Sequence, residues 1–313
     1  MAQLKQRVKK PYAVKIGTDE TVLHIIAYIF VSIVAVTCLL PFVLVISASF
    51  SSESAILRNG FSLLPQEPGI EAYKQVFNEP EVVLRAYMVT IILTIAGTFT
   101  ALFLQSMTAY VLARRDFKWR NGFSLFFYIT TLFNGGLVPY FILMTQYLHM
   151  RNNYLALLLP LLFSIFNLLI LKSYIMGIPV EMIESAKIDG CSVFRTYLSV
   201  ILPLMKPALA TIGLFIALGY WNDWYSAMLF ISDDKMKPLQ YMLYEKVNNI
   251  EGYKRLIASG LSGISAEAVN AISLPTETLK MALTVVVTGP IILLYPVIQK
   301  YYVKGITLGA VKG

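Results

Sequence analysis

The 313-residue sequence contains few charged residues. Asp, Glu, Lys and Arg make up 14% of the chain, whereas hydrophobic residues make up 57% and the mean hydropathy is +0.65. Soluble domains contain about 25% charged and about 45–50% apolar residues. Since this chain has too little polar surface to cover a soluble core, the composition excludes an ordinary soluble domain and predicts an integral membrane protein.

Cysteine and histidine are also scarce. The two cysteines are Cys38 and Cys191, the two histidines are His24 and His149, and none of them lies at a spacing typical of metal ligands. The apolar segments hold no Ser/Asp, His/Glu or paired-carboxylate combination of the kind that membrane enzymes use. We therefore expect no metal site and no catalytic residue, which disfavours an intramembrane protease or a glycosyltransferase.

The chain is basic, with a formal net charge of +8. Membrane proteins become basic because Lys and Arg collect in their cytoplasmic loops. No aromatic RNA-binding signature is present, and no basic run occurs beyond the N-terminus, so we expect no nucleic-acid partner.

Six apolar segments are long enough to cross a bilayer, which takes about 20 residues. The sequence therefore predicts an all-α polytopic membrane protein with six transmembrane helices. The first apolar run exceeds the roughly 7–15 residues of a signal peptide, so we expect an uncleaved span. The expected spans are residues 23–49, 86–113, 122–147, 154–176, 208–232 and 278–302.

The distribution of Lys and Arg predicts the orientation. Residues 1–22 hold five basic residues, residues 114–121 hold four, and four more lie between Lys172 and Lys206. The positive-inside rule then puts both termini in the cytoplasm. The expected organisation is a cytoplasmic segment 1–22, a first helix with its external loop 23–85, a core 86–302 and a cytoplasmic tail 303–313. The external segments 50–85 and 233–277 are expected to be caps, the former with a short amphipathic stretch at Ala72–Phe77.

A polar segment interrupts the apolar pattern, and residues 181–207 read EMIESAKIDGCSVFRTYLSVILPLMKP. Pro179 suits a helix start, Gly190 suits a left-handed C-terminal cap, and Ser192 suits the N-cap of a second helix. In that helix Thr196 is expected to face away from one apolar stripe, and Pro203 and Pro207 to end it. The stripe comprises Phe194, Tyr197, Leu198, Ile201 and Leu202. This pattern predicts a helix–turn–helix docking element on the cytoplasmic membrane surface, and an ordinary amphipathic loop is the alternative.

The same segment resembles the EAA signature of bacterial ABC importer permeases, which is Glu-Ala-Ala-x-x-x-Gly, about nine residues, then Ile-x-Leu-Pro. Ser185 replaces the first Ala and Val200 replaces the Ile, and both changes preserve size or apolar character. The resemblance implies that this segment couples the chain to an ATPase. The implied coupling residues are Glu184, Ser185, Ala186, Asp189, Gly190, Cys191, Val200, Leu202 and Pro203.

Other segments extend the resemblance. Gly219–Tyr225, reading GYWNDWY, is similar to carbohydrate-importer permeases, and Gly135-Gly136 with Pro139 resembles the subgroup that handles complex oligosaccharides, including aldouronates. The terminal segment 302–313 resembles the same subgroup. The family implies a MetI-like, type I ABC importer fold of the maltose-transporter kind in the bacterial cell membrane. It also implies a second, different permease subunit, two ATPase subunits, an extracytoplasmic solute-binding protein and an oligosaccharide substrate.

The chain carries no ATP-binding loop of its own. The Walker A motif requires a Gly-Lys pair, and the sequence contains none. We therefore expect no cofactor in this chain, with ATP and Mg²⁺ bound by the partner ATPase.

Two clusters are candidates for the substrate path. Asn134 and Gly135 interrupt the third span, where a break either lines a cavity or only kinks the helix. In the fifth span Trp221, Trp224 and Tyr225 are expected on one helix face beside Asn222 and Asp223. Aromatic rings beside amide and carboxylate groups suit a sugar, although Trp and Tyr also anchor spans at membrane interfaces.

An ion-coupled secondary transporter is the competing function. Such a mechanism requires ionisable residues within the spans, and Asp223 is the one plausible candidate. It would leave the EAA-like segment without a purpose.

Overall fold

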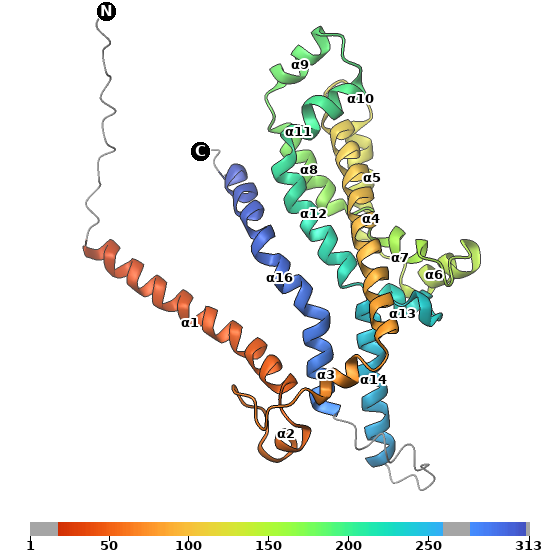
Figure 1. The fold of residues 1–313 in the computed structure, drawn as a ribbon. Coiled ribbons are helices and arrows are strands. Elements are labelled where there is room, and N and C mark those ends of the chain that lie inside the picture. Colours follow the sequence, from red (N-terminus) through yellow and green to blue (C-terminus); the bar gives the residue numbers. More distant parts are fainter. Residues whose placement is uncertain (1–17, 259–275, 311–313) are drawn as a thin grey trace, which may run out of the picture.

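The computed structural model describes residues 18–258 and 276–310, and within these ranges it contains helices and no strands (Figure 1). Three helices are each long and apolar enough to cross a membrane: α1 (Thr18–Ser49), α4 (Pro80–Ala113) and α16 (Thr276–Ala310). They match the expected first, second and sixth spans, and α16 continues to Ala310, beyond the expected end at residue 302.

The other candidate spans are bent. α5 (Arg120–Leu132) meets α6 (Leu137–Ile142) and the π-helical turn Leu143–Tyr147 at 113°, and α7 (Leu155–Leu158) with the 3₁₀ turn Leu159–Leu161 meets α8 (Ile165–Met176) at 47°. The helical segment Val193–Leu204 meets α12 (Lys206–Trp221) at 83°. Counting each bent pair as one span gives six candidates within the described ranges.

The break expected in the third span at Asn134 and Gly135 is confirmed, whereas the expectation of one continuous helix over residues 208–232 is wrong. Residues 122–147 break at Phe133–Gly136, where Gly136 has a φ of +86° and donates its N–H to Asn134 Oδ1 at 2.8 Å. Residues 208–232 break after Trp221, because Asp223 Oδ1 accepts the N–H of Ser226 at 3.0 Å and starts α13 (Tyr225–Phe230). A polar side chain stabilises the backbone at each break.

α4 is the central helix, and it packs most extensively against α12 and α8. Gly97 of α4 lies under the ring of Tyr220 of α12, so closely that a Cβ atom on Gly97 would lie 2.4 Å from ring carbons. The hydroxyl of Tyr220 donates to the carbonyl of Leu158 at 2.7 Å and so links α12 to the end of α7. This ring joins three elements that are distant in the sequence.

α2 (Glu53–Asn59), α3 (Glu71–Val76) and α14 (Leu239–Ala258) lie at one end of the molecule (Figure 1). The carboxylate of Glu53 accepts four hydrogen bonds, from the backbone N–H groups of Glu277 and Thr278 and from the hydroxyls of Thr276 and Thr278. A negative charge at a helix N-terminus is stabilising, so Glu53 fixes the start of α16.

The predicted amphipathic stretch at Ala72–Phe77 is confirmed, since α3 buries Ala72 and Val76 against α16. The helix α14 was not predicted within the segment 233–277, which was expected only as an external cap, although Leu239, Met242 and Leu243 are spaced as on one helix face. Residues 1–17, 259–275 and 311–313 lie outside the described ranges, so the expectations for the basic N-terminal segment and the last tail residues fall there.

α1 stands apart from the other helices over most of its length (Figure 1). All its side chains from residue 19 to residue 43 are exposed, while Ser47, Ala48 and Ser49 at its end are buried. An exposed face this apolar requires lipid or another membrane-embedded chain around it.

We predict that Gly97→Ala destabilises the chain by about 1–3 kcal/mol, because the added methyl group displaces the Tyr220 ring. The measurement is the unfolding midpoint in detergent. Gly219→Ala, where the added Cβ meets nothing within 4 Å, is the matched control and should unfold at or above the unmodified temperature. Equal midpoints for Gly97→Ala and the unmodified chain would contradict this packing.

Candidate functional site

A helix pair formed by α9 (Val180–Ile188) and α10 (Val193–Thr196) lies at the end of the molecule opposite α2 and α14 (Figure 1). Gly190 has a φ of +74°, its N–H donates to Lys187 O at 3.0 Å, and the N–H of Cys191 donates to Ala186 O at 2.9 Å. These two bonds form a Schellman cap. Ser192 Oγ accepts the N–H of Arg195 at 3.3 Å and caps α10. The predicted turn and both caps are confirmed.

The second helix differs from the expected one. A π-helical turn, Tyr197–Ile201, follows α10, and α11 (Leu202–Leu204) follows in turn. Thr196 and Tyr197 are buried, whereas Phe194 is 54% exposed and Leu198 is 42% exposed. The expected apolar stripe is wrong at Phe194 and Leu198, and so is the outward position of Thr196. The π turn at Tyr197–Ile201 changes the number of residues per turn, so residues on its two sides no longer share the faces of one regular helix. The helical segment ends at Leu204, between Pro203 and Pro207, as expected, and α12 continues at 83° to it.

Tyr197 anchors the helix pair to the body of the protein. Its side chain is 1% exposed, its hydroxyl lies 2.7 Å from Ser106 Oγ of α4, and its ring stacks on Tyr110 with 5.8 Å between centroids. Ile201, one helical turn further, is fully buried in the same cluster. These contacts attach the segment after the turn to α4.

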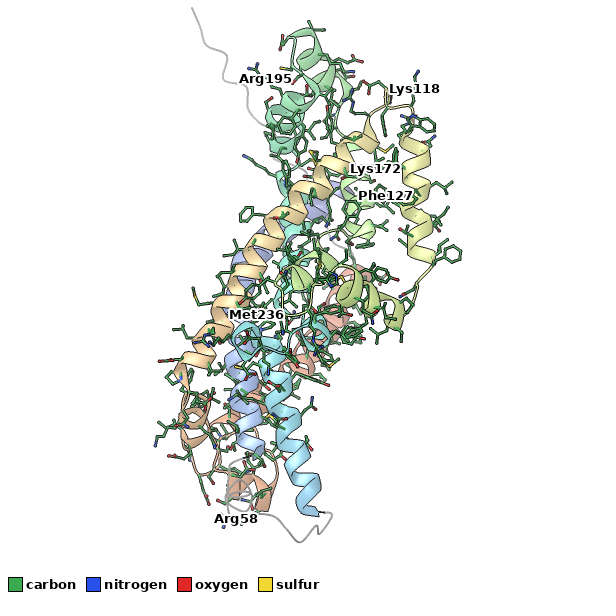
Figure 2. The ribbon with its side chains drawn as sticks, turned by 90° about the vertical axis from the view of Figure 1, so that its right-hand side faces the viewer. Arg58, Lys118, Phe127, Lys172, Arg195 and Met236 are labelled. Carbon is green, nitrogen blue, oxygen red and sulfur yellow. The ribbon has the colours of Figure 1, made fainter. Side chains whose placement is uncertain are left out.

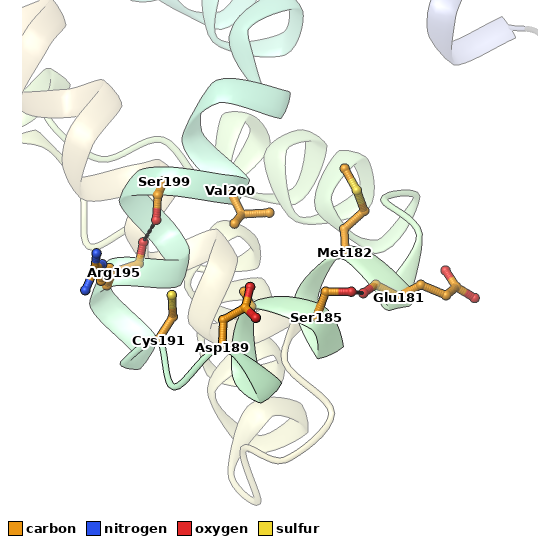
Figure 3. Close-up of a pocket in the computed structure, with 9 residues that line it drawn as sticks. Glu181, Met182, Ser185, Asp189, Cys191, Arg195, Ser199 and Val200 are labelled. Carbon is orange, nitrogen blue, oxygen red and sulfur yellow. Dashed lines mark hydrogen bonds between the residues drawn. The ribbon is translucent and has the colours of Figure 1, made fainter.

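A groove of about 520 Å³ separates α9 from the second helix (Figure 3). Asp189 and Arg195 lie on opposite sides of it, and Ser185 and Ser199 each donate a hydrogen bond to the carbonyl four residues earlier in their own helix. The lining residues are Glu181, Met182, Ser185, Ala186, Asp189, Cys191, Arg195, Ser199 and Val200. The groove thus offers carboxylates on the α9 side and a guanidinium on the other.

The structure separates the predicted coupling residues into groups. Ser185, Ala186, Asp189, Cys191 and Val200 line the groove. Leu202 packs against the core cluster around Tyr197, and Glu184 lines a second cavity beneath α9.

α9 itself is largely uncovered. Ala186 is its buried residue, whereas Ile188 is 86% exposed and Met182 is 44% exposed. Apolar side chains that are exposed beside charged ones are typical of a surface that another protein covers.

The break between α12 and α13 holds the predicted aromatic cluster in a different arrangement from the expected one. Trp221 is 8% exposed and packs against Val83, Ala86 and Val287, and Asn222 is exposed and accepts a hydrogen bond from Gln240 at 3.2 Å. Trp224 stacks on Tyr244 of α14 at 4.3 Å between centroids. The prediction that Trp221, Trp224 and Tyr225 share one helix face is wrong, because the helix ends between them.

Two buried polar atoms at this break have no hydrogen-bond partner among the described residues: Trp221 Nε1 and Asp223 Oδ2. Gln240 and Tyr244 of α14 were not predicted to belong to this cluster, because sequence separation hides their proximity.

Asn134 and Gly135 are exposed at the break between α5 and α6. The break is linked to α13 through the helix that follows it, since Tyr140 and Phe141 of α6 pack on Phe230 with centroid distances of 5.7 Å and 5.9 Å. The two predicted parts of the substrate path, at the α5–α6 break and at the α12–α13 break, thus lie next to helices that pack on each other.

The described residues contain no group of three or more His, Cys, Asp or Glu side chains arranged to hold a metal ion.

Comparisons with known proteins place these features in a family. The model of the family described as "Binding-protein-dependent transport system inner membrane component" matches residues 105–308. The chain is 38% identical over 286 residues to the polygalacturonan/rhamnogalacturonan transport system permease protein YtcP of Bacillus subtilis, covering 91% of this chain and 96% of the relative. It is 36% identical to protein LplC of the same organism, covering 91% of this chain and 93% of that one.

A solved structure agrees with the sequence relatives. The crystal structure of a bacterial ABC transporter involved in the import of the acidic polysaccharide alginate matches with a TM-score of 0.78 and 28% identity, covering 91% of this chain and 98% of that one. The exposed helix pair, the bent apolar helices and these matches agree: the chain belongs to the family of binding-protein-dependent transport system inner membrane components and is a membrane-embedded permease subunit of an ABC importer.

Proposed function

We propose that this chain forms one half of the translocation path for an oligosaccharide, with a second, different permease subunit forming the other half. ATP and Mg²⁺ are bound, and ATP is hydrolysed, by two separate ATPase subunits. The observation that carries the proposal is the exposed α9, capped at Gly190 and joined to the core through Tyr197.

The helix pair supplies the coupling. An ATPase subunit covers Ile188 and Met182, and a cationic side chain of that subunit enters the groove beside Glu181 and Asp189. When the ATPase dimer closes, it moves α9. The Schellman cap at Gly190 transmits this movement to the following segment, and the buried contact of Tyr197 with Ser106 passes it to α4.

α4 in turn carries the movement to the substrate path. The Tyr220 ring on Gly97 couples α4 to α12, and α12 ends at the break that holds Asn222 and Asp223. A displacement at α9 therefore reaches the path through two tyrosines that pack on α4.

The substrate class is supported by the chemistry at the α12–α13 break. Tyr225 is 43% exposed with its ring edge-on to Trp224, and Asn222 at the end of α12 is exposed. An aromatic surface suits the C–H faces of a sugar ring, and the exposed polar side chain of Asn222 suits its hydroxyls. The names of the relatives include polygalacturonan, rhamnogalacturonan and alginate, so oligosaccharides containing uronic acids are the first substrates to test.

The orientation follows from the basic segments. The α4–α5 loop and the α9–α10 segment carry Lys and Arg and lie at one end of the molecule, which the positive-inside rule assigns to the cytoplasm. α2 and α14 then face outward, where the solute-binding protein delivers the substrate.

We predict that Gly190→Val lowers oligosaccharide uptake at least tenfold, because a left-handed conformation costs a β-branched residue about 1–2 kcal/mol and breaks the cap. Gly190→Asn, which tolerates this conformation, should retain most of the uptake. Uptake is measured in proteoliposomes that contain the whole complex, with ATP inside.

An uncoupler is the control for the competing ion-coupled mechanism. Uptake that an uncoupler abolishes, and that proceeds without ATP, would refute the ATP-driven function. Equal uptake by Gly190→Val and the unmodified protein would instead refute the role of the turn.

We predict that Tyr225→Ala lowers oligosaccharide uptake about tenfold, equivalent to about 1.4 kcal/mol of lost stacking, while binding-protein-stimulated ATPase activity persists. Tyr128→Ala removes a similarly exposed ring from α5 and is the matched control, with no change expected. If both variants take up sugar at the unmodified rate, the cluster serves helix packing instead.

We predict that single cysteines at Asn153 and Asn248 react with a membrane-impermeant thiol reagent in intact cells, whereas a cysteine at Asn121 reacts only after the membrane is opened. All three positions are exposed, so the membrane alone decides access. Cys38 and Cys191 are first replaced by Ala to remove background labelling. Labelling at residue 121 in intact cells would reverse the orientation.

A further inference from the structure

A second cavity, of about 470 Å³, lies on the other side of α9 from the groove. It is bounded by the end of α4, the α4–α5 loop, the start of α5, the last turns of α8, and α9. We call it the basic cavity because its lining includes five cationic and two acidic side chains, an excess of three positive charges. These are Arg114, Arg115, Arg120, Lys172 and Lys187, with Asp116 and Glu184.

One of the two acids is already neutralised. Asp116 accepts two hydrogen bonds from Arg114, at 2.9 Å and 2.6 Å, and lies 3.5 Å from Lys187 Nζ. The Arg114 guanidinium holds the pKa of Asp116 well below its usual range, so this carboxylate stays charged and paired. Arg114 and Lys187 are thus satisfied within the chain.

The other three cations have no counter-charge among the residues that the structure describes. Arg115 and Arg120 form no ion pair among the described residues, and the ammonium of Lys172 donates to a neutral hydroxyl, Ser124 Oγ, at 2.8 Å. Arg120 and Lys172 are half-buried between α4, α5 and α8. Figure 2 shows Lys172 between α4 and α5. Arg115 is exposed at the rim of the cavity. Partial burial of Arg120 and Lys172 without a counter-charge is unfavourable, so an anion from outside the chain is expected here.

The rest of the lining is mainly apolar, comprising Leu112, Ala113, Ile175, Met176, Ile178, Val180 and Ile183, together with Tyr110 and Asn121. The adjoining helix α5 has no buried residue and exposes Phe123 and Phe126. A cationic rim above apolar walls, next to an uncovered membrane helix, suits a ligand with an anionic head and a hydrocarbon body better than a free anion.

We propose that the basic cavity binds the phosphate of an anionic phospholipid headgroup, held by Arg115, Arg120 and Lys172, with the acyl chains along α5. Arginine presents paired N–H donors that match phosphate oxygens. Glu184 faces the same cavity and would accept a hydrogen bond from a headgroup hydroxyl, which favours a glycerol headgroup. The site goes beyond the proposed transport function, and it places a lipid against α9.

The test uses the purified whole complex and native mass spectrometry after exchange into phosphatidylglycerol or phosphatidylcholine. We expect one phosphatidylglycerol retained per copy of this chain and no phosphatidylcholine. Arg115→Gln with Arg120→Gln should weaken retention about 30-fold, which corresponds to about 2 kcal/mol for two cations near an anionic lipid. Arg115→Lys with Arg120→Lys keeps both charges and should retain the lipid, which separates loss of charge from misfolding.

The matched control is Lys118→Gln. Lys118 is an exposed cation of the same loop that does not line the basic cavity, so its removal should leave retention unchanged (Figure 2). An equal loss with Lys118→Gln would overturn the proposal in favour of diffuse surface charge, and equal retention of phosphatidylcholine would overturn the preference for an anion.

Free phosphate distinguishes the two possible sources of the anion. If excess inorganic phosphate, or glycerol phosphate without acyl chains, displaces phosphatidylglycerol, the ligand is a soluble phosphate and the lipid assignment is wrong. Because retention is measured without transport, failure of this test is separate from failure of the proposed function.

Discussion

The contact of Tyr197 with α4 is the interaction on which the functional end of this protein depends. α9 and the turn at Gly190 contribute little to the core, since Ala186 is the buried residue of α9. The segment after the turn is held because the Tyr197 hydroxyl meets Ser106 and its ring meets Tyr110 inside the apolar cluster. A buried hydrogen bond between two hydroxyls is directional, whereas apolar packing is not. The bond to Ser106 therefore fixes where the Tyr197 side chain lies on α4, in addition to keeping it buried. An exposed helix can transmit force only if its far end is fixed in this manner.

Polar side chains also stabilise the positions where the membrane helices break. A bilayer tolerates non-helical backbone only where protein or a polar cavity satisfies it. Here Asn134 accepts the N–H of Gly136, and Asp223 accepts the N–H of Ser226, so each break supplies its own backbone partner. Polar side chains at these positions thereby serve the backbone and, at the same time, present amide and carboxylate groups beside the aromatic rings. Glu53 also accepts backbone N–H groups, at the N-terminus of α16, but it has no assigned role in the substrate path.

The two faces of α9 have different chemistry. The groove on one side offers carboxylates and open apolar side chains, which suit a protein partner. The basic cavity on the other side offers arginines and a lysine beside apolar walls. α9 thus lies between the surface assigned to the ATPase and the surface assigned to the bilayer, and a change at either one reaches the same nine-residue helix.

The sequence by itself determined the membrane class, the ends of the α9–α10 turn and the family. These follow from composition, from Gly190 and Ser192 at their cap positions, and from a long position-specific signature, all of which are local properties. It did not determine the π turn at Tyr197–Ile201 or the helix end at Trp221, so the predicted faces were wrong at Phe194 and at Trp224. A helical wheel assumes one continuous helix with 3.6 residues per turn. The π turn changes that number, and the break after Trp221, where Asp223 accepts the N–H of Ser226, ends the helix. Proximity of Tyr244 to Trp224, and of Arg120 to Lys172, was likewise decided only by the tertiary structure, because packing brings together side chains that no sequence spacing relates.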